Sequence, residues 1–333
     1  MTNPNIIKVI YGSENLGIGV ITVWQDLKIL DLEVTLVAED EIRLPFFREN
    51  ALRVGLGTSF RQTVCINNKQ EACQGCVLEA LCAYSKIFAA SSYPYIGFFA
   101  PDTLVMLTPG TPFKLNLRLF GPAVAYYPYF YFSLENLAGR GIGLRNSTGK
   151  RGRFILKEIN AIAPDGQKTL IFTRENDARV QEARAFTLAD YLEYRPVQFL
   201  QLKTLSPLRL KYQNHFATSL EFHILLRAAL RRISHLYFLA TGENLQLDYR
   251  GLVDAAMAVN QVENNLRWFD YQRYSTTQHQ EMKLGGLVGE VSYQGEMTEL
   301  YPFIKAAEIL AIGKSTAFGF GRFKVRVEEG KGY

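Results

Sequence analysis

The sequence is poor in histidine and confines its cysteines to one short stretch. Its 333 residues include four histidines, all in the second half, so a histidine base contributed by the first half is excluded. No window approaches the roughly 18 uninterrupted apolar residues that a membrane-spanning helix needs, and the first thirty residues lack the basic start and apolar core of a signal peptide. We therefore expect a cytoplasmic protein without membrane contact.

What is present is an ordinary globular composition with a mild basic excess. Hydrophobic residues make up 48% of the chain, and the formal net charge is +5. This length favours about two domains, each large enough to bury its own core. The basic residues gather in two glycine-rich loops and in Arg227, Arg231 and Arg232, which favours a polyanionic partner.

The last glycine-rich loop, residues 313–322, has the residues of a phosphate-binding loop. Gly319 and Gly321 permit a positive φ and the close approach of a ligand backbone. The donors to anionic oxygens are Lys314, Ser315, Thr316 and Arg322. Gly313 to Thr316 also resembles the end of a Walker A motif, but position 308 is Glu308 instead of glycine and the preceding pattern is helical, which excludes an ATP site.

The same order of parts occurs twice. Tyr127-Pro128 opens a helix pattern that runs into a glycine-rich loop at 139–152 and a strand pattern at 154–156, and Tyr301-Pro302 opens a second copy that ends in the strand 323–327. Upstream of the first copy, alternation predicts strands at 30–37 and 113–120 around a helix at 46–60. In the second half we expect a strand within 197–210, a long helix at 219–240 and a glycine-interrupted strand at 283–293.

The pattern predicts an α+β protein of two tandem ferredoxin-like (RRM-like) domains, each with the order β-α-β-β-α-β. We place the first domain at 1–160, a connecting segment at 161–196 and the second domain at 197–333. A four-cysteine insertion at about 61–92 interrupts the first domain. Its ligands would be Cys65, Cys73, Cys76 and Cys82, all the cysteines of the chain.

Four thiols in so short a stretch favour a closed metal site. Disulfides are disfavoured in the expected compartment, and a Cys-x-x-Cys turn with two outer cysteines matches tetrahedral structural zinc. An iron–sulfur cluster is an alternative, because four thiolates can ligate either zinc or such a cluster. A loop without metal is the other alternative. No open coordination position for catalysis is indicated.

Several motifs together resemble the CRISPR-associated endoribonucleases that process pre-crRNA, the Cas-six branch of the RAMP superfamily. The matching residues are Leu44-Pro45, Arg48, Ala51 to Arg53, Gly55, the cysteines, Phe222-His223, Arg231 to Ser234, Arg273 to Ser275, Met282 to Gly286 and the terminal Gly-Phe-Gly loop. The resemblance implies metal-independent cleavage of CRISPR repeat RNA by 2′-hydroxyl attack, giving 2′,3′-cyclic phosphate and 5′-hydroxyl ends. It also implies retention of the mature crRNA and delivery to an effector complex. We expect a monomer or a homodimer.

The preferred general base is His223, near the start of the long helix. Arg227 and Arg231 follow at i+4 and i+8, so one stripe carries His, Arg and Arg. The neighbouring cations disfavour protonation, which favours a neutral imidazole at pH 7. The alternative interpretation is a solvated histidine beside a face that only binds RNA.

Other candidates for the chemistry lie around 273–283. His279 is a second possible base, Lys283 is placed to stabilise transition-state charge, and Tyr274 is placed to orient the 2′-hydroxyl or donate a proton. His215 and His235 have weaker support. The RNA-binding residues that we expect are Arg48, Arg53, Arg61, Arg227, Arg231, Arg273, Lys314, Ser315, Thr316 and Arg322. A catalytically inactive RAMP-type subunit that only binds crRNA is the alternative function.

Overall fold

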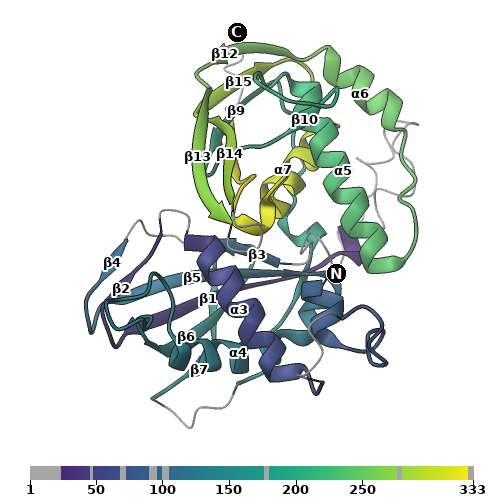
Figure 1. The fold of residues 1–333 in the computed structure, drawn as a ribbon. Helices are drawn as coiled ribbons and strands as arrows, with labels where there is room; N and C mark the ends of the chain where they lie inside the picture. Colours follow the sequence, from purple (N-terminus) through teal and green to yellow (C-terminus); the bar gives the residue numbers. More distant parts are fainter. Residues whose placement is uncertain are drawn as a thin grey trace. The chain divides into compact units, whose positions relative to one another are not determined.

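The chain forms two compact units of mixed α and β structure (Figure 1). The computed structural model describes residues 24–45, 48–67, 73–89, 96–99, 105–175, 180–275 and 280–328. The first unit holds 28–187 together with 317–319, and the second unit holds the other described residues. Within the described part of the chain, no helix combines the length and apolar character required to cross a membrane.

The first unit is built on an antiparallel sheet in the order β3-β5-β1-β6-β7. Its strands are β1 (Lys28–Ala38), β3 (Ile96–Phe99), β5 (Pro112–Phe120), β6 (Phe154–Ile162) and β7 (Lys168–Thr173). The strand β8 (Phe186–Thr187) pairs with β1, and β2 (Ile42–Arg43) pairs with β4 (Met106–Leu107). Counted from β1 through β6, the strands have the order expected for a ferredoxin-like fold.

Two helices, α3 (Arg48–Val64) and α4 (Tyr127–Arg140), pack together in this unit. Leu32, Val34 and Leu36 alternate along β1 and are buried, so one face of the sheet supplies the core. Pro128 lies in the first turn of α4, where its missing N–H costs no helical hydrogen bond. The predicted Tyr-Pro helix start is therefore confirmed.

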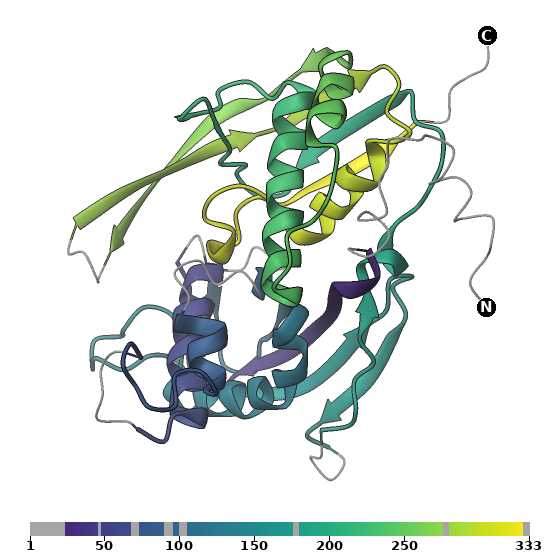
Figure 2. The same cartoon turned by 90° about the vertical axis from the view of Figure 1, so that its right-hand side faces the viewer.

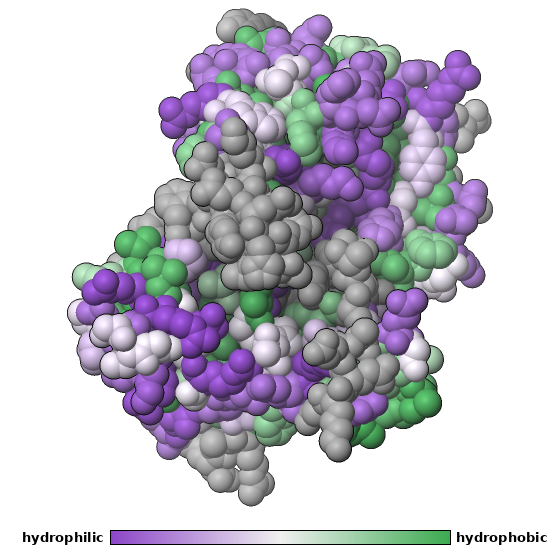
Figure 3. Space-filling view, viewed as in Figure 1, coloured by the Kyte–Doolittle hydropathy of each residue, from purple (hydrophilic) through white to green (hydrophobic). Residues whose placement is uncertain are grey.

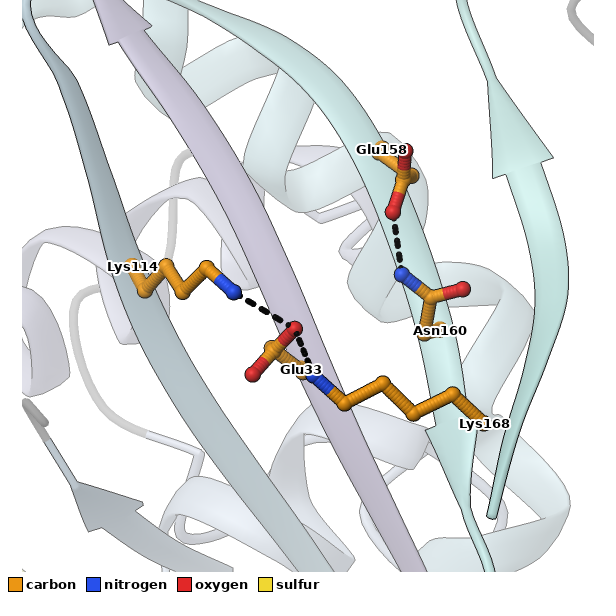
Figure 4. A network of polar contacts seen from close by, with 5 residues as sticks. All are labelled: Glu33, Lys114, Glu158, Asn160 and Lys168. Carbon is orange, nitrogen blue, oxygen red and sulfur yellow. Dashed lines mark hydrogen bonds and ion pairs between the residues drawn. The ribbon is translucent and has the colours of Figure 1, made fainter.

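The polar residues of the same strands are tied together across the sheet (Figure 4). Glu33 on β1 accepts hydrogen bonds from Lys114 Nζ on β5 at 2.9 Å and from Lys168 Nζ on β7 at 2.7 Å. Burial raises the pKa of Glu33, but the two lysines outweigh it and hold the pKa below its usual value. Asn160 donates to Glu158 beside this pair. The two lysine contacts thus link side chains of β5 and β7 to Glu33 on the central strand.

The second unit repeats the arrangement in the sheet order β12-β15-β9-β16. Its strands are β9 (Phe199–Thr204), β12 (Asn260–Asn264), β15 (Glu290–Gln294) and β16 (Phe323–Val327), and its helices are α5 (Phe222–Thr241), α6 (Tyr249–Met257) and α7 (Tyr301–Leu310). The short hairpin of β10 (Lys211–Tyr212) and β11 (His215–Phe216) precedes α5. The α+β class and the repeated order of elements are thus confirmed.

An additional hairpin, β13 (Arg267–Ser275) with β14 (Gln280–Val288), is inserted before β15 and extends away from its unit in Figure 2. The single strand predicted at 283–293 is therefore wrong, because it is the end of β14 followed by β15. The break is at Gly289, whose φ is 129°, and a Cβ there would collide with the carbonyl of Asn265.

The segment 161–196 contains regular structure. It includes the end of β6, all of β7 and β8, and the 3-10 helix η3 (Leu188–Tyr191). Both β7 and β8 pair within the first sheet. The polar composition of this segment reflects an edge strand and its turns.

Candidate functional site

The helix α5 separates an apolar face from a basic stripe, as its sequence predicts. Phe222, Leu225, Leu226, Ala229 and Ile233 are buried, whereas His223 and Arg227 are half-buried and Arg231 is exposed. Hydrophilic side chains gather over α5 and α6 in Figure 3. Arg232 is different, since its Nε donates to the carbonyl of Leu310 at the end of α7 at 3.3 Å and so ties the two helices together.

The imidazole of His223 is held neutral mainly by its surroundings. Burial lowers its pKa; the charge of Glu221 opposes that shift and the charge of Arg227 adds to it, with a net value below the ordinary one. Its Nδ1 is buried and has no hydrogen-bond partner among the described residues. A substrate would therefore have to meet the ring at Nε2. A neutral, half-buried imidazole is suited to accept a proton.

The β10–β11 hairpin places an aromatic ring beside this histidine. Gln213 and Asn214 have φ values of 48° and 66°, the left-handed pair required by a two-residue type I′ turn. The turn pairs Tyr212 with His215, and the Tyr212 ring meets the His223 ring edge-on with centroids 5.3 Å apart. Sequence reasoning missed Tyr212; the signal was the two-residue Gln-Asn turn directly before the long helix.

The segment 205–212 joins the parts of this site within the second unit. The carbonyl of Arg209 accepts from Lys314 N at 2.8 Å, and Arg209 Nη1 donates to the carbonyl of Gly285 at 2.7 Å. Lys211 accepts a hydrogen bond from Arg231 Nη2 at 3.2 Å through its carbonyl. The glycine-rich loop, β14 and α5 are therefore all anchored to one short stretch of backbone.

The glycine-rich loop is both packed and equipped with donors. Gly313 and Gly321 have φ values of 91° and 82°, and a Cβ at Gly321 would collide with the carbonyl of Ile312. Arg322 N donates to Ser206 Oγ at 3.0 Å. The Lys314 side chain is exposed, while Ser315 and Thr316 are half-buried. The backbone thus has a structural role that leaves the Lys314 ammonium accessible.

Three predicted residues lie on β13 and β14, where the backbone register is Tyr274 with Glu281, Arg273 with Met282 and Gln272 with Lys283. His279 lies outside the described residues. His223, Arg227 and Arg231 lie on α5, and Lys314 lies on the glycine-rich loop. Both elements contact the segment 205–212.

The three arginines of α3 that were predicted to bind RNA lie in the first unit, each with different neighbours. Arg48 is buried at the start of the helix, and the Arg53 guanidinium lies 4.7 Å from the centroid of the Phe318 ring. Arg61 lies 5.7 Å from the ring centroid of Tyr84, and its charge acts on Cys73. Arg61 therefore belongs with the cysteine segment.

The four cysteines carry free thiols and are all half-buried. Cys76 N donates to the carbonyl of Cys73 at 3.0 Å, which closes the expected Cys-x-x-Cys turn. Burial raises the pKa of Cys73, Arg61 lowers it, and Cys82, Cys65 and Cys76 raise it further, so the thiols interact electrostatically. The donor set suits zinc in its chemistry. Among the described residues, no three ligands are already spaced to hold a metal ion.

Comparison with known proteins relates each half of the chain to a different family model. Residues 202–323 match the model of the CRISPR-associated endoribonuclease Cas6, and residues 27–185 match a model described as an AF_1859 N-terminal domain. The Cas6 match lies wholly in the second half of the chain. The Cas6 match covers α5, the inserted hairpin and the glycine-rich loop, which are the elements of the candidate site. No curated protein matches the sequence significantly.

Solved Cas6 structures share the fold at low sequence identity. A Cas6 product complex is 12% identical with a TM-score of 0.56, covering 90% of this chain and 100% of that chain. Thermus thermophilus Cas6 is 12% identical with a TM-score of 0.51, covering 90% and 99%. A partial Cas6-RT-Cas1–Cas2 complex is 14% identical with a TM-score of 0.55 and covers 93% of this chain. This chain spans only 48% of that one, and 30% of a chain in the fuller complex.

Proposed function

We propose that this protein cleaves CRISPR repeat RNA without a catalytic metal ion. The neutral imidazole of His223 takes the proton of a ribose 2′-hydroxyl, and the 2′-oxygen attacks the adjacent phosphorus as the bond from phosphorus to the 5′-oxygen breaks. The 5′-oxygen takes up a proton, which leaves 2′,3′-cyclic phosphate and 5′-hydroxyl ends. The cations of Arg227 and Arg231 stabilise the charge that develops on phosphorus-bound oxygens.

One observation carries this proposal: the site of His223. Its ring is half-buried, its pKa is lowered by burial, and it begins a stripe of two arginines on one helix. At neutral pH such a histidine accepts a proton while the arginines keep their charge. Tyr212, whose ring packs against the imidazole, limits its orientation.

The partners that follow are CRISPR repeat RNA before cleavage and crRNA afterwards. A Cas6 product complex and a Cas6-RT-Cas1–Cas2 complex are among the structures with this fold, which supports an RNA ligand and CRISPR proteins as partners. We propose that the protein retains the mature crRNA as a monomer or homodimer and passes it to an effector complex.

The cysteine segment is proposed to hold one structural zinc ion, with an iron–sulfur cluster as the alternative. The ligands would be Cys65, Cys73, Cys76 and Cys82, two of them already in a Cys-x-x-Cys turn. When bound, zinc would stabilise the segment and would leave catalysis to the residues around His223.

The decisive experiment is cleavage of a radiolabelled repeat RNA by purified protein in excess EDTA. We expect a single cut with a 5′-hydroxyl and a cyclic phosphate that acid opens to a 2′- or 3′-monophosphate. A repeat whose scissile ribose is 2′-deoxy is the matched control and is expected to stay intact. Cleavage of the deoxy control, or loss of cleavage in EDTA with recovery in Mg²⁺, would contradict the mechanism.

A crRNA-binding subunit without catalysis is the second candidate. It is favoured by the absence of histidine from the first half of the sequence, where α3 begins with Arg48. Binding of repeat RNA with no cut in any buffer would establish this function.

A further inference from the structure

The first unit has a cavity of about 950 Å³ between α3 and the glycine-rich loop that follows α4. Two carboxylates, Asp40 and Glu41, lie at the cavity. Five cations line it: Arg140, Arg145, Lys150, Arg151 and Arg153. The cavity is therefore strongly basic.

Both carboxylates are already neutralised by single arginines. Glu41 pairs with Arg43 at 2.7 Å, and Asp40 accepts from Arg153 Nε at 2.9 Å. The hydrogen bonds from Arg153 hold the pKa of Asp40 below its usual range. In the part of the chain that the structure describes, the other four lining cations form no direct ion pair with a carboxylate, although the charge of Lys150 also acts on Asp40. Their charge is left for an anion from outside.

Hydrogen bonds order the backbone of the loop and the side chain of Arg140. Asn146 Oδ1 accepts from Thr148 N at 3.0 Å and from Lys150 N at 2.9 Å, and Leu144 N donates to the carbonyl of Arg43 at 2.8 Å. Arg140 Nη1 donates to Gln62 Oε1 at 2.8 Å. Each guanidinium has five N–H donors, so one such contact orients Arg140 and leaves donors for a ligand.

The residues that line the cavity suit the phosphate groups of a nucleic acid better than its bases. No aromatic side chain is among the described residues that line the cavity, so a base has no stacking surface there. Val54 and Leu137 are the apolar members, too few for a nucleobase slot. A cationic groove without stacking residues tracks the nucleic-acid backbone irrespective of sequence.

We propose that this cavity binds the phosphodiester backbone of single-stranded RNA in a sequence-independent manner, as a site of the first unit additional to the one at His223. This inference rests on the proposed function in taking RNA as the ligand. The cavity would increase the affinity for RNA molecules that are longer than the cleaved sequence.

The test uses the full-length chain with Lys150→Ala/Arg151→Ala and, as a matched control, Lys28→Ala/Lys157→Ala, two exposed lysines of the same unit that lie outside the cavity. Binding of a labelled oligouridine and of repeat RNA is measured over a salt series. We expect the slope of log affinity against log salt to flatten by roughly 1.4 in the cavity variant, about 0.7 for each lost contact, and to stay unchanged in the control. Lys150→Arg/Arg151→Lys is expected to restore the slope.

An unchanged slope in the cavity variant, with a melting temperature equal to wild type, would overturn the proposal. Pyrophosphate is the second probe: release of oligouridine by micromolar pyrophosphate would assign the cavity to a small diphosphate instead of RNA. Repeat cleavage by the wild type is recorded on the same preparation. If the wild type cleaves repeat RNA but the cavity variant keeps the wild-type salt slope, only the cavity proposal is rejected. If the cavity variant has a flattened slope but the wild type does not cleave, only the nuclease mechanism is rejected.

Discussion

His223 gains its chemical character from burial more than from a partner. A histidine activated by a carboxylate has a raised pKa, whereas the pKa of His223 is lowered, with burial as the largest cause. A base of this kind is deprotonated before it meets the substrate. Its protonation is resisted further by Arg227 at the next turn of α5.

Replacement of this side chain gives the first prediction. His223→Ala should lower single-turnover cleavage by about 10² or more, the usual contribution of a general base, and change RNA affinity by no more than a few-fold. His235→Ala is the matched control, because His235 is an exposed histidine on the same helix. Unchanged cleavage in His223→Ala would transfer the role to His279 or to Tyr274 with Lys283.

The pH profile of wild type supplies the signature of that base. Because burial lowers the pKa of His223, the cleavage rate should rise with pH to a midpoint on the acid side of the ordinary histidine range and then be level. The midpoint should be missing from the residual activity of His223→Ala. The same shift means that neutral His223 contributes stability above its unfolded pKa, and this contribution is lost as pH falls through the folded value.

At the scale of elements, the cysteine segment joins directly to α3, since Cys65 N donates to the carbonyl of Arg61 at 2.8 Å. Cys73→Ser with Cys76→Ser should release one metal ion per chain and lower the melting temperature, because metal-binding free energy at such a site is also folding free energy. Elemental analysis and melting curves of both proteins, prepared without oxygen, make the measurement. Iron with labile sulfide would contradict zinc, and no metal in the wild type would contradict both.

Most elements were predictable because their apolar periodicity is strong. The strand β1 alternates in sequence from Leu30 to Leu36, and α5 keeps a clear apolar face, so both were found from the sequence. The β10–β11 hairpin was missed because its strands have two residues each, too few for a period. The boundary between β14 and β15 was missed because alternation continues past Gly289, where a Cβ would collide with the carbonyl of Asn265.

The candidate site was only partly predictable. The stripe of His223, Arg227 and Arg231 follows from helical spacing alone. The neighbouring Tyr212 ring and the anchoring of Lys314 N at Arg209 depend on long-range packing, which spacing does not encode. Arg232 was predicted to be part of the basic surface, but it binds the carbonyl of Leu310 on α7. This contact joins residues far apart in the sequence, so helical spacing does not reveal it.

For the whole molecule, the salt dependence of RNA binding reports how many phosphates its cations contact. Lys314→Ala should flatten the slope of log affinity against log salt by about 0.7 for repeat and unrelated RNA alike, with cleavage at saturating protein preserved. Lys324→Ala, an exposed lysine on β16, is the matched control. An unaltered slope in Lys314→Ala would rule out phosphate contact, and a lower melting temperature would instead indicate a packing role for the loop.

The placement of the first strand of each unit has a consequence for how the chain folds during synthesis. In the first unit β1 lies between β5 and β6, and in the second β9 lies between β15 and β16. One edge of β1 therefore stays unpaired until β6 has left the ribosome. One edge of β9 likewise stays unpaired until β16 has left it. Such non-local pairing slows folding, and an uncovered strand edge is a template for pairing with another chain. The nascent protein is thus most prone to aggregation in the interval before residues 154–162, and again before 323–327, become available.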